Sequence, residues 1–417
     1  MLSFAREREA CVIHKKREPR HFTYEIYEVN QMKLNLSRTD TMDAIAPMMC
    51  AVGKTSFPGT EGILIEAHAP DVCILTSYDT EKGLRRQITA SVEEDGLYAI
   101  PAQKFMQTLR VMEGDEITLT VDEKNIACIS SGKSSHKMNA VKGEDFPQLP
   151  RLQSDRGFVV GQGILKKMMG KVAFAMGIND QRAVLNGCYF HVTENSLHLV
   201  SCDTFKMARC TVATPIEDKT VQKEGEVSET DFAFIVPVKT VNELQRLLDD
   251  GEEDTVRIHV SRKFIIFEIN DITFFSRLVD GDYIDYDRIL MRSHRIFMEI
   301  DRNAWISALE RAALVTEERI AGSVRSHVKL VLEGNVLKIM ATSAAGSTYD
   351  EIDVDHEGPD LTIAFNNRFL IDTVRACESK TVRVSLSSPI SSINVEPILT
   401  EEGSEDIFML LPVRIKE

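Results

Sequence analysis

The chain has 417 residues and a mass of 46.9 kDa, which suits two to four domains that each bury their own core. Apolar residues make up 43% and charged residues 27%, a composition that excludes a disordered protein. The net charge of −15 argues against a surface that binds nucleic acid on every side, but it does not exclude one local basic face.

Helices and short strands alternate along the chain. Apolar periodicity and proline positions predict helices over 40–54, 101–112, 162–182, 237–250, 301–325 and 366–380. Pro101 and Pro237 are expected at the first helical position of their helices. Strand-like runs follow three of these helices, namely E-I-T-L-T-V from 116, T-V-R-I-H-V from 255 and T-V-R-V-S-L from 381.

These elements recur at a domain-sized period. Three similar runs, D-V-C-I-L-T-S-Y-D from 71, N-S-L-H-L-V-S-C-D from 195 and N-V-L-K-I-M-A-T-S from 335, each precede one of the helices at 101, 237 and 366. These helix starts lie 136 and 129 residues apart, too far for the units of a solenoid. The sequence therefore predicts three homologous α+β domains over 32–150, 151–290 and 291–417, with 1–31 as an extension outside them.

The helix near 162 has one apolar stripe and one basic side. Ile164, Met168 and Val172 recur every four residues, while Lys166, Lys167 and Lys171 fall off that stripe. For one helix alone, a solvated face is the better interpretation. The six predicted helices together carry a net charge of +4 and the rest of the chain −19. That separation favours one surface that binds phosphates without regard to sequence.

Signatures of catalysis, metal binding and membrane insertion are missing from the sequence. The segment G-K-S-S at 132–135 lacks the first glycine of a P-loop and joins two strand-like runs, so it predicts a hairpin turn. The acidic stretch Asp280 to Asp287 lacks the closing glutamate of a calcium loop and is expected to be an exposed turn. Eight scattered cysteines form no C-x-x-C pair, no run is long enough for a membrane span, and the N-terminus lacks a secretory signal core. We therefore expect a non-catalytic cytoplasmic protein without cofactor or metal.

From residue 32 onward, the chain resembles the β sliding clamp of bacterial DNA polymerase III. The resemblance rests on the order and spacing of M-K-L-N-L-S (32–37), Q-R-A-V-L-N-G (181–187), S-C-D-T-F-K-M-A (201–208), L-V-D-G-D-Y-I-D-Y (278–286) and M-L-L-P-V-R-I (409–415). It implies three clamp domains, each with two helices on antiparallel sheets, and a head-to-tail homodimer that closes six domains into a ring around duplex DNA. It also implies that the DNA polymerase III α subunit, the clamp loader and other proteins with clamp-binding peptides are partners at the nucleoid.

The resemblance and the helix faces together predict three sets of site residues. The DNA-facing set is Lys54, Lys104, Arg110, Lys166, Lys167, Lys171, Arg182, Lys239, Arg246 and Arg325. The set expected to form a hydrophobic peptide-binding groove is Leu185, Thr204, Phe205, Lys206, Met207, Ile284, Arg288, Ile289, Asn366, Phe369, Ser391, Met409, Leu411, Pro412, Val413 and Arg414. The dimer set is His136 and Met138 on one side with Leu314 and Val315 on the other.

Several positions depart from the family pattern. His136 stands where an aromatic residue is commoner, and D-T-F-K-M (203–207) replaces the usual D-G-H-R-L turn. Phe57-Pro58-Gly59-Thr60 replaces the family's Leu-Pro-Ile-Leu. A divergent clamp paralogue that serves a repair or mobile-element polymerase is therefore the alternative, and a hydrolase or metal enzyme that uses the acidic stretch 280–287 is a remote third hypothesis.

Overall fold

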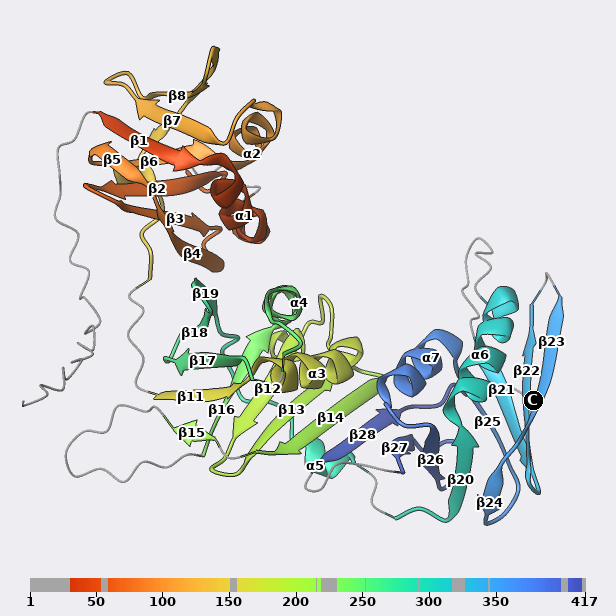
Figure 1. Cartoon of the computed structure of the whole chain (residues 1–417). Coiled ribbons are helices and arrows are strands. Elements are labelled where there is room, and N and C mark those ends of the chain that lie inside the picture. Colours follow the sequence, from red (N-terminus) through yellow and green to blue (C-terminus); the bar gives the residue numbers. More distant parts are fainter. Residues whose placement is uncertain are drawn as a thin grey trace, which may run out of the picture.

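The computed structural model describes residues 31–53, 59–150, 156–214, 216–218, 231–251, 253–290, 293–316, 327–343, 346–398 and 404–414 (Figure 1). The predicted extension therefore lies almost wholly outside the described residues, as do Lys54, Phe57, Pro58 and Arg325. The described residues form three α+β domains that follow one another along a bent chain.

The first domain begins with a strand whose residues alternate between buried and partly exposed, as expected for one covered face of a sheet. Its first helix follows Ser37, whose hydroxyl accepts the Asp40 N–H at 3.2 Å and so caps the helix. The elements of this domain are β1 (Met32–Ser37), α1 (Arg38–Met48), β2 (Gly62–His68), β3 (Val72–Tyr78), β4 (Lys82–Thr89), β5 (Ser91–Glu94), β6 (Gly96–Pro101), α2 (Ala102–Val111), β7 (Glu116–Val121), β8 (Ile126–Ser131), β9 (Ser134–Asn139) and β10 (Val141–Lys142).

The other two domains repeat this pattern of strand, helix, strands, helix and strands. The second comprises β11 (Arg156–Gly161), α3 (Gln162–Val172), β12 (Gly187–Val192), β13 (Ser196–Cys202), β14 (Lys206–Ala213), β15 (Glu217–Asp218), β16 (Phe232–Pro237), α4 (Val238–Leu247), β17 (Thr255–Val260), β18 (Phe264–Ile269), β19 (Ile272–Arg277) and the short α5 (Tyr286–Ile289). The third comprises β20 (Ile296–Asp301), α6 (Arg302–Thr316), β21 (His327–Glu333), β22 (Val336–Thr342), β23 (Ser347–Asp353), β24 (Asp355–Glu357), β25 (Leu361–Asn366), α7 (Asn367–Ala376), β26 (Thr381–Leu386), β27 (Ile393–Pro397) and β28 (Glu405–Leu410). The strand runs predicted from 71, 116, 195, 255, 335 and 381 are confirmed, and so is the hairpin turn between β8 and β9.

Two of the sheets continue from one domain into the next. Strand β4 pairs with β19, which joins the first domain to the second in a ten-stranded sheet. Strand β14 pairs with β28, which joins the second domain to the third in a nine-stranded sheet, with Met207 opposite Met409. The remaining sheets are β5-β1-β7-β8-β9 in the first domain and β23-β22-β21-β25 in the third, and β9 and β23 are among their edge strands. The backbone pairing therefore fixes how successive domains meet.

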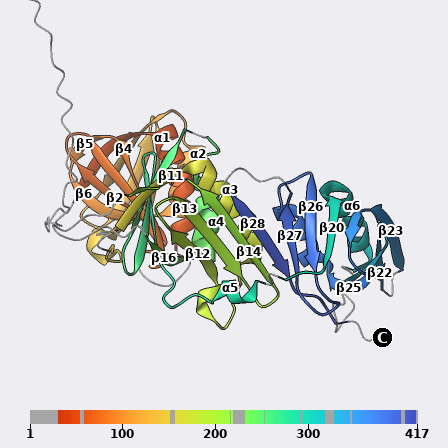
Figure 2. The same ribbon diagram turned by 90° about the horizontal axis from the view of Figure 1, so that it is seen from below.

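The longer helices lie on the inner side of the bend, and the sheets lie outside them (Figures 1 and 2). They pack in pairs, α1 with α2, α3 with α4 and α6 with α7, and α3 also contacts α7 across the second domain junction. Each pair turns an apolar stripe onto its sheet, so its other side faces the open space inside the bend.

Helix boundaries differ from the predictions in physically clear ways. Helix α3 ends at Val172 and not near 182, because after one 3₁₀ turn the Gly177 N–H bonds the Leu185 carbonyl at 2.8 Å. The periodicity places Ile164 on the apolar stripe of α3, but its side chain is exposed, and Leu165 and Met169 bury that side of the helix instead. Pro101 and Pro237 are caps that precede their helices, with ψ values of 112° and 146° that still belong to a strand.

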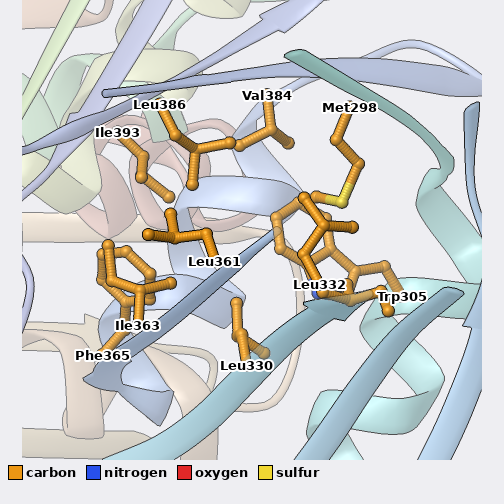
Figure 3. A pocket seen from close by; sticks show the side chains of 11 residues that line it. Met298, Trp305, Leu330, Leu332, Leu361, Ile363, Phe365, Val384, Leu386 and Ile393 are labelled. Atoms are coloured by element: carbon orange, nitrogen blue, oxygen red, sulfur yellow. The ribbon is translucent and has the colours of Figure 1, made fainter. Parts of the chain in front are cut away.

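A small gap in the core of the third domain lies around Trp305 (Figure 3). The side chains that line it are all apolar or aromatic, and they come from α6 and from both sheets of that domain. The indole N–H of Trp305 has no hydrogen-bond partner within the described part of the chain. A gap with one polar atom offers too few partners to hold a water or a polar ligand, so it belongs to core packing.

Candidate nucleic-acid interface and peptide groove

Helix α2 carries two of the predicted DNA-facing residues. Phe105, Met106 and Leu109 bury one side of the helix, which turns Lys104 and Arg110 outward, where both are exposed. Neither cation forms an ion pair with another of the described residues. Both can therefore contact an external anion without first breaking an ion pair with a carboxylate.

Helices α3 and α4 add cations that are held by surface ion pairs. Lys166 lies 2.9 Å from Asp250, Lys167 3.8 Å from Glu378 and Arg246 3.2 Å from Glu243. Lys239 reaches across the first domain junction to Glu81 at 3.4 Å. Such exposed pairs are worth little, about 0–1 kcal/mol each, so a phosphate is able to compete for these cations.

Lys171 and Arg182 differ from the other predicted DNA-facing residues in what surrounds them. Lys171 is largely buried against the third domain, where its ammonium pairs with Asp406 at 2.6 Å. Burial acts to lower the pKa of Lys171, but the hydrogen bond and the charge of Asp406 outweigh it, and this pKa is raised. Arg182 lies beyond α3, bonded to Asp180 at 3.3 Å and to the Thr204 hydroxyl at 3.4 Å. It therefore borders the predicted groove and not the helical face.

The floor of the predicted groove is a hydrophobic cluster separate from the main core. Leu185, Met207 and Met409 are buried in this cluster, and Ile284 packs against it. The cluster lies where β14 of the second domain pairs with β28 of the third, so both domains contribute to it. These four residues come from four separate segments of the sequence, and the structure brings them together in one hydrophobic cluster.

The C-terminal segment continues this apolar surface beyond β28. The Leu411 N–H donates to the Phe205 carbonyl at 2.9 Å, and the Val413 N–H donates to the Ala364 carbonyl at 2.7 Å. These bonds hold the segment in place while Leu411 and Val413 remain exposed. Exposed apolar side chains on a fixed backbone are typical of a binding surface.

The remaining groove residues lie around this surface. Asn366 caps α7 by accepting the Phe369 N–H at 3.2 Å, and Ser391 closes a turn by bonding Ser388. Arg288 and Ile289 are exposed on α5, and the Arg288 guanidinium pairs with Asp285 at 2.8 Å. Pro412 and Arg414 belong to the C-terminal segment.

Two tyrosines at the groove are absent from the predicted set of groove residues. Tyr283 stacks on Tyr189 with ring centroids 4.9 Å apart, and both pack on the cluster of Leu185, Met207 and Met409. Burial raises the pKa of Tyr283 far above its usual range, so its hydroxyl stays neutral. The run D-Y-I-D-Y-D (282–287) could have indicated Tyr283 from the sequence. Apolar residues among aspartates in a turn indicate that one face of the turn packs on the protein.

The edge strands β9 and β23 have opposite charge. Strand β9 carries Lys137 and no acidic residue, and His136 is exposed on it while Met138 is half-buried. Strand β23 carries Asp350, Glu351 and Asp353 and no basic residue. Near that edge, Arg311 of α6 pairs with Asp350 at 2.6 Å, and Leu314 of α6 is 81% exposed while Val315 is half-buried.

The described residues hold no group of three or more side chains suited to a metal ion. Of the predicted turn at 280–287, residues 280–285 form neither helix nor strand, but Tyr286 and Asp287 begin the short helix α5. Burial raises the pKa of Cys202 to about 11 and that of Cys73 to about 12, so these thiols stay protonated and unreactive at neutral pH. No helix in the described part of the chain is long and apolar enough to cross a membrane.

Comparison with known proteins gives one consistent match along the chain. Models of the N-terminal, central and C-terminal domains of the DNA polymerase III beta subunit match residues 32–150, 159–285 and 287–411. The beta sliding clamp of Salmonella typhimurium is 29% identical over 366 residues, which cover 87% of this chain and 94% of that protein.

Solved structures agree with that match. A putative DNA polymerase III beta subunit from Eubacterium rectale superposes with a TM-score of 0.83 at 25% identity, over 92% of this chain and 100% of that one. The DNA polymerase III subunit beta of Pseudomonas aeruginosa gives a TM-score of 0.82 at 25% identity, with the same coverage.

Proposed function

The chain belongs to the DNA polymerase III beta subunit family, the bacterial sliding clamps, and we propose that two copies of it close head to tail into a ring around duplex DNA. The observation that carries this proposal is a bent chain with its helices on the inner side and a free sheet edge at each end. A ring holds DNA by enclosing it, so the clamp tethers a polymerase without gripping any sequence.

The size of the ring follows from its helices. Two copies would line the opening with twelve longer helices, and at about 10 Å per packed helix these give an opening roughly 28 Å across. A B-form duplex, at about 20 Å, passes through with room for water and ions. The clamp is therefore expected to slide, because its phosphate contacts stay weak and largely mediated by water and counterions.

Ring closure is supported by the charges of the two free edges. An antiparallel pairing of β9 with β23 of the other copy would place Lys137 near Glu351 and Asp353 while it satisfies the backbone groups of both edges. Met138 and Leu314 would supply apolar contact at the same boundary. Light scattering tests dimer formation, because a dimer has about twice the 46.9 kDa mass of one chain.

The DNA-facing set that the geometry supports is Lys104, Arg110, Lys166, Lys167, Lys239 and Arg246. Lys171 is left out because its ammonium already forms a buried ion pair with Asp406. The acidic remainder of the chain would repel DNA and so keep the duplex on the helical face.

Replacing Lys104 and Arg110 together by alanine is expected to weaken equilibrium binding to a short duplex and to lower its salt dependence. Each phosphate that the protein no longer neutralises reduces the slope of log K against log salt by about 0.9. Fluorescence anisotropy over a salt series measures the slope. Lys263→Ala, at an exposed site in the β17–β18 turn and off the helices, is the control that should leave the slope unchanged. An unchanged slope in the double variant would exclude these two residues from the DNA contact.

The groove is expected to bind short linear peptides from the partners of the clamp. The α subunit of DNA polymerase III and the clamp loader are the partners that the family implies. Aliphatic anchors of a peptide would pack on the exposed side chains of Leu411 and Val413, above the buried cluster of Met207 and Met409, and the exposed polar groups around them would set the register. The protein itself would perform no chemistry in the bacterial cytoplasm, and its activity would be to keep partners on DNA.

A further inference from the structure

Phe205 is unusual in being an exposed aromatic residue on a rigid turn. Its side chain is 53% exposed at the tip of the β13–β14 hairpin. The Asp203 carboxylate accepts the N–H groups of Phe205 at 2.7 Å and Lys206 at 2.8 Å, which fixes the turn from inside. The Phe205 carbonyl in turn accepts the Leu411 N–H. The ring is therefore held outward by its backbone and not left there by a mobile loop.

A second aromatic ring from the third domain stands beside it. The ring centroids of Phe205 and Phe369 are 6.0 Å apart and tilted by 32°. The Lys206 ammonium, paired with Asp203, lies over the Phe369 ring at 4.6 Å from its centroid. These three side chains, Phe205, Lys206 and Phe369, form what we call the aromatic shelf. Because Lys206 occupies the face of Phe369, Phe205 presents the more open aromatic surface.

The shelf is continuous with the groove floor. Met207 follows the shelf directly along β14 and lies opposite Met409, and Leu411 leaves β28 at the shelf. A peptide that packs on Leu411, which is exposed and bonded to the Phe205 carbonyl, would therefore place a neighbouring side chain against Phe205. An aromatic side chain there would gain an offset or edge-to-face contact in addition to the area it buries.

We propose that Phe205 determines peptide specificity and selects an aromatic side chain at the position that contacts the aromatic shelf. This inference rests on the proposed function of the groove and names the chemistry of its preferred ligand. An aromatic pair gains about 0.5–1.5 kcal/mol beyond area burial, so a phenylalanine peptide should bind about threefold to tenfold more tightly than its leucine counterpart.

The test uses the full-length clamp and peptides from the α subunit of DNA polymerase III in which each aromatic residue is replaced in turn by leucine. Dissociation constants are measured for the wild type, for Phe205→Leu and for Phe297→Leu, an exposed phenylalanine on β20 of the third domain. Phe205→Leu keeps an apolar side chain and removes only the ring. Its thermal unfolding should match that of the wild type.

The expected result is that one phenylalanine-to-leucine change weakens binding threefold to tenfold in the wild type and in Phe297→Leu. In Phe205→Leu the same change should alter binding by less than twofold. An equal preference in all three proteins, or none in the wild type, would overturn the role of Phe205. If no peptide binds the wild type at all, the groove function itself fails and the specificity inference fails with it.

Discussion

A clamp carrying His136→Glu and Met138→Glu is expected to be a monomer at concentrations where the wild type is a dimer. Both side chains lie on the free edge of β9, and the proposed partner edge carries Asp350, Glu351 and Asp353. Like charges placed together across an interface cost several kcal/mol, and each 1.4 kcal/mol weakens association tenfold. The dissociation constant of the dimer should therefore rise about a thousandfold. Light scattering over a dilution series measures the change.

A second variant with reversed charges on β23 shows whether repulsion or misfolding causes the loss of the dimer. Adding Glu351→Lys and Asp353→Lys to the same chain turns the repulsive edge pair into an attractive one, so a large part of the dimer should return. Asp350 is left in place because it holds Arg311 at 2.6 Å within its own domain. A double glutamate variant that stays dimeric across the dilution series would show that β9 is not the ring-closing edge.

Replacing Lys171 by methionine is expected to destabilise the junction of the second and third domains by about 3–5 kcal/mol, because the change leaves a buried carboxylate without its cation. The side chains of Lys171 and Asp406 are only 13% and 6% exposed, and their charged atoms lie 2.6 Å apart. Urea unfolding monitored by circular dichroism measures the loss. At neutral pH the pair is fully formed, because the raised pKa of Lys171 lies above 10.5 and its stabilisation is lost only as pH rises through that raised value.

Lys167 provides a matched control one turn earlier on the same helix. Its side chain is 53% exposed, and its ammonium lies 3.8 Å from Glu378, so Lys167→Met should cost less than about 1 kcal/mol. Combining Lys171→Met with Asp406→Leu should recover most of the lost stability, because no unpaired charge then remains. Equal effects from Lys171→Met and Lys167→Met would mean that burial of the Lys171 pair contributes nothing.

The repeated architecture was predictable because it depends on local patterns. The near-identical runs T-V-R-I-H-V and T-V-R-V-S-L became the matching strands β17 and β26, and the other four predicted runs also became strands. The helix face also placed Arg110 on the outer side of α2, whereas Lys104 on the same helix was predicted from resemblance to the family. Such patterns repeat every two or every three to four residues, so a single sequence contains them.

Features that depend on contacts between domains were not predictable from those patterns. The pairing of β14 with β28 buries Lys171, which periodicity alone assigns to an exposed basic side. Phe205 and Phe369 belong to different domains, and only the domain junction brings their rings together. The groove residues came from resemblance to the family, because nothing local distinguishes Leu185 or Met207 from ordinary core.

The most direct test of the sliding-clamp account compares retention on circular and linear DNA. The clamp is loaded onto nicked plasmid by its clamp loader, half of the sample is cut once with a restriction enzyme, and bound protein is separated by gel filtration. The account predicts that the clamp stays on the circle through a high-salt wash and leaves the linear form by sliding off its ends. Equal retention on both forms, or loss from both, would contradict a ring that holds DNA by enclosing it.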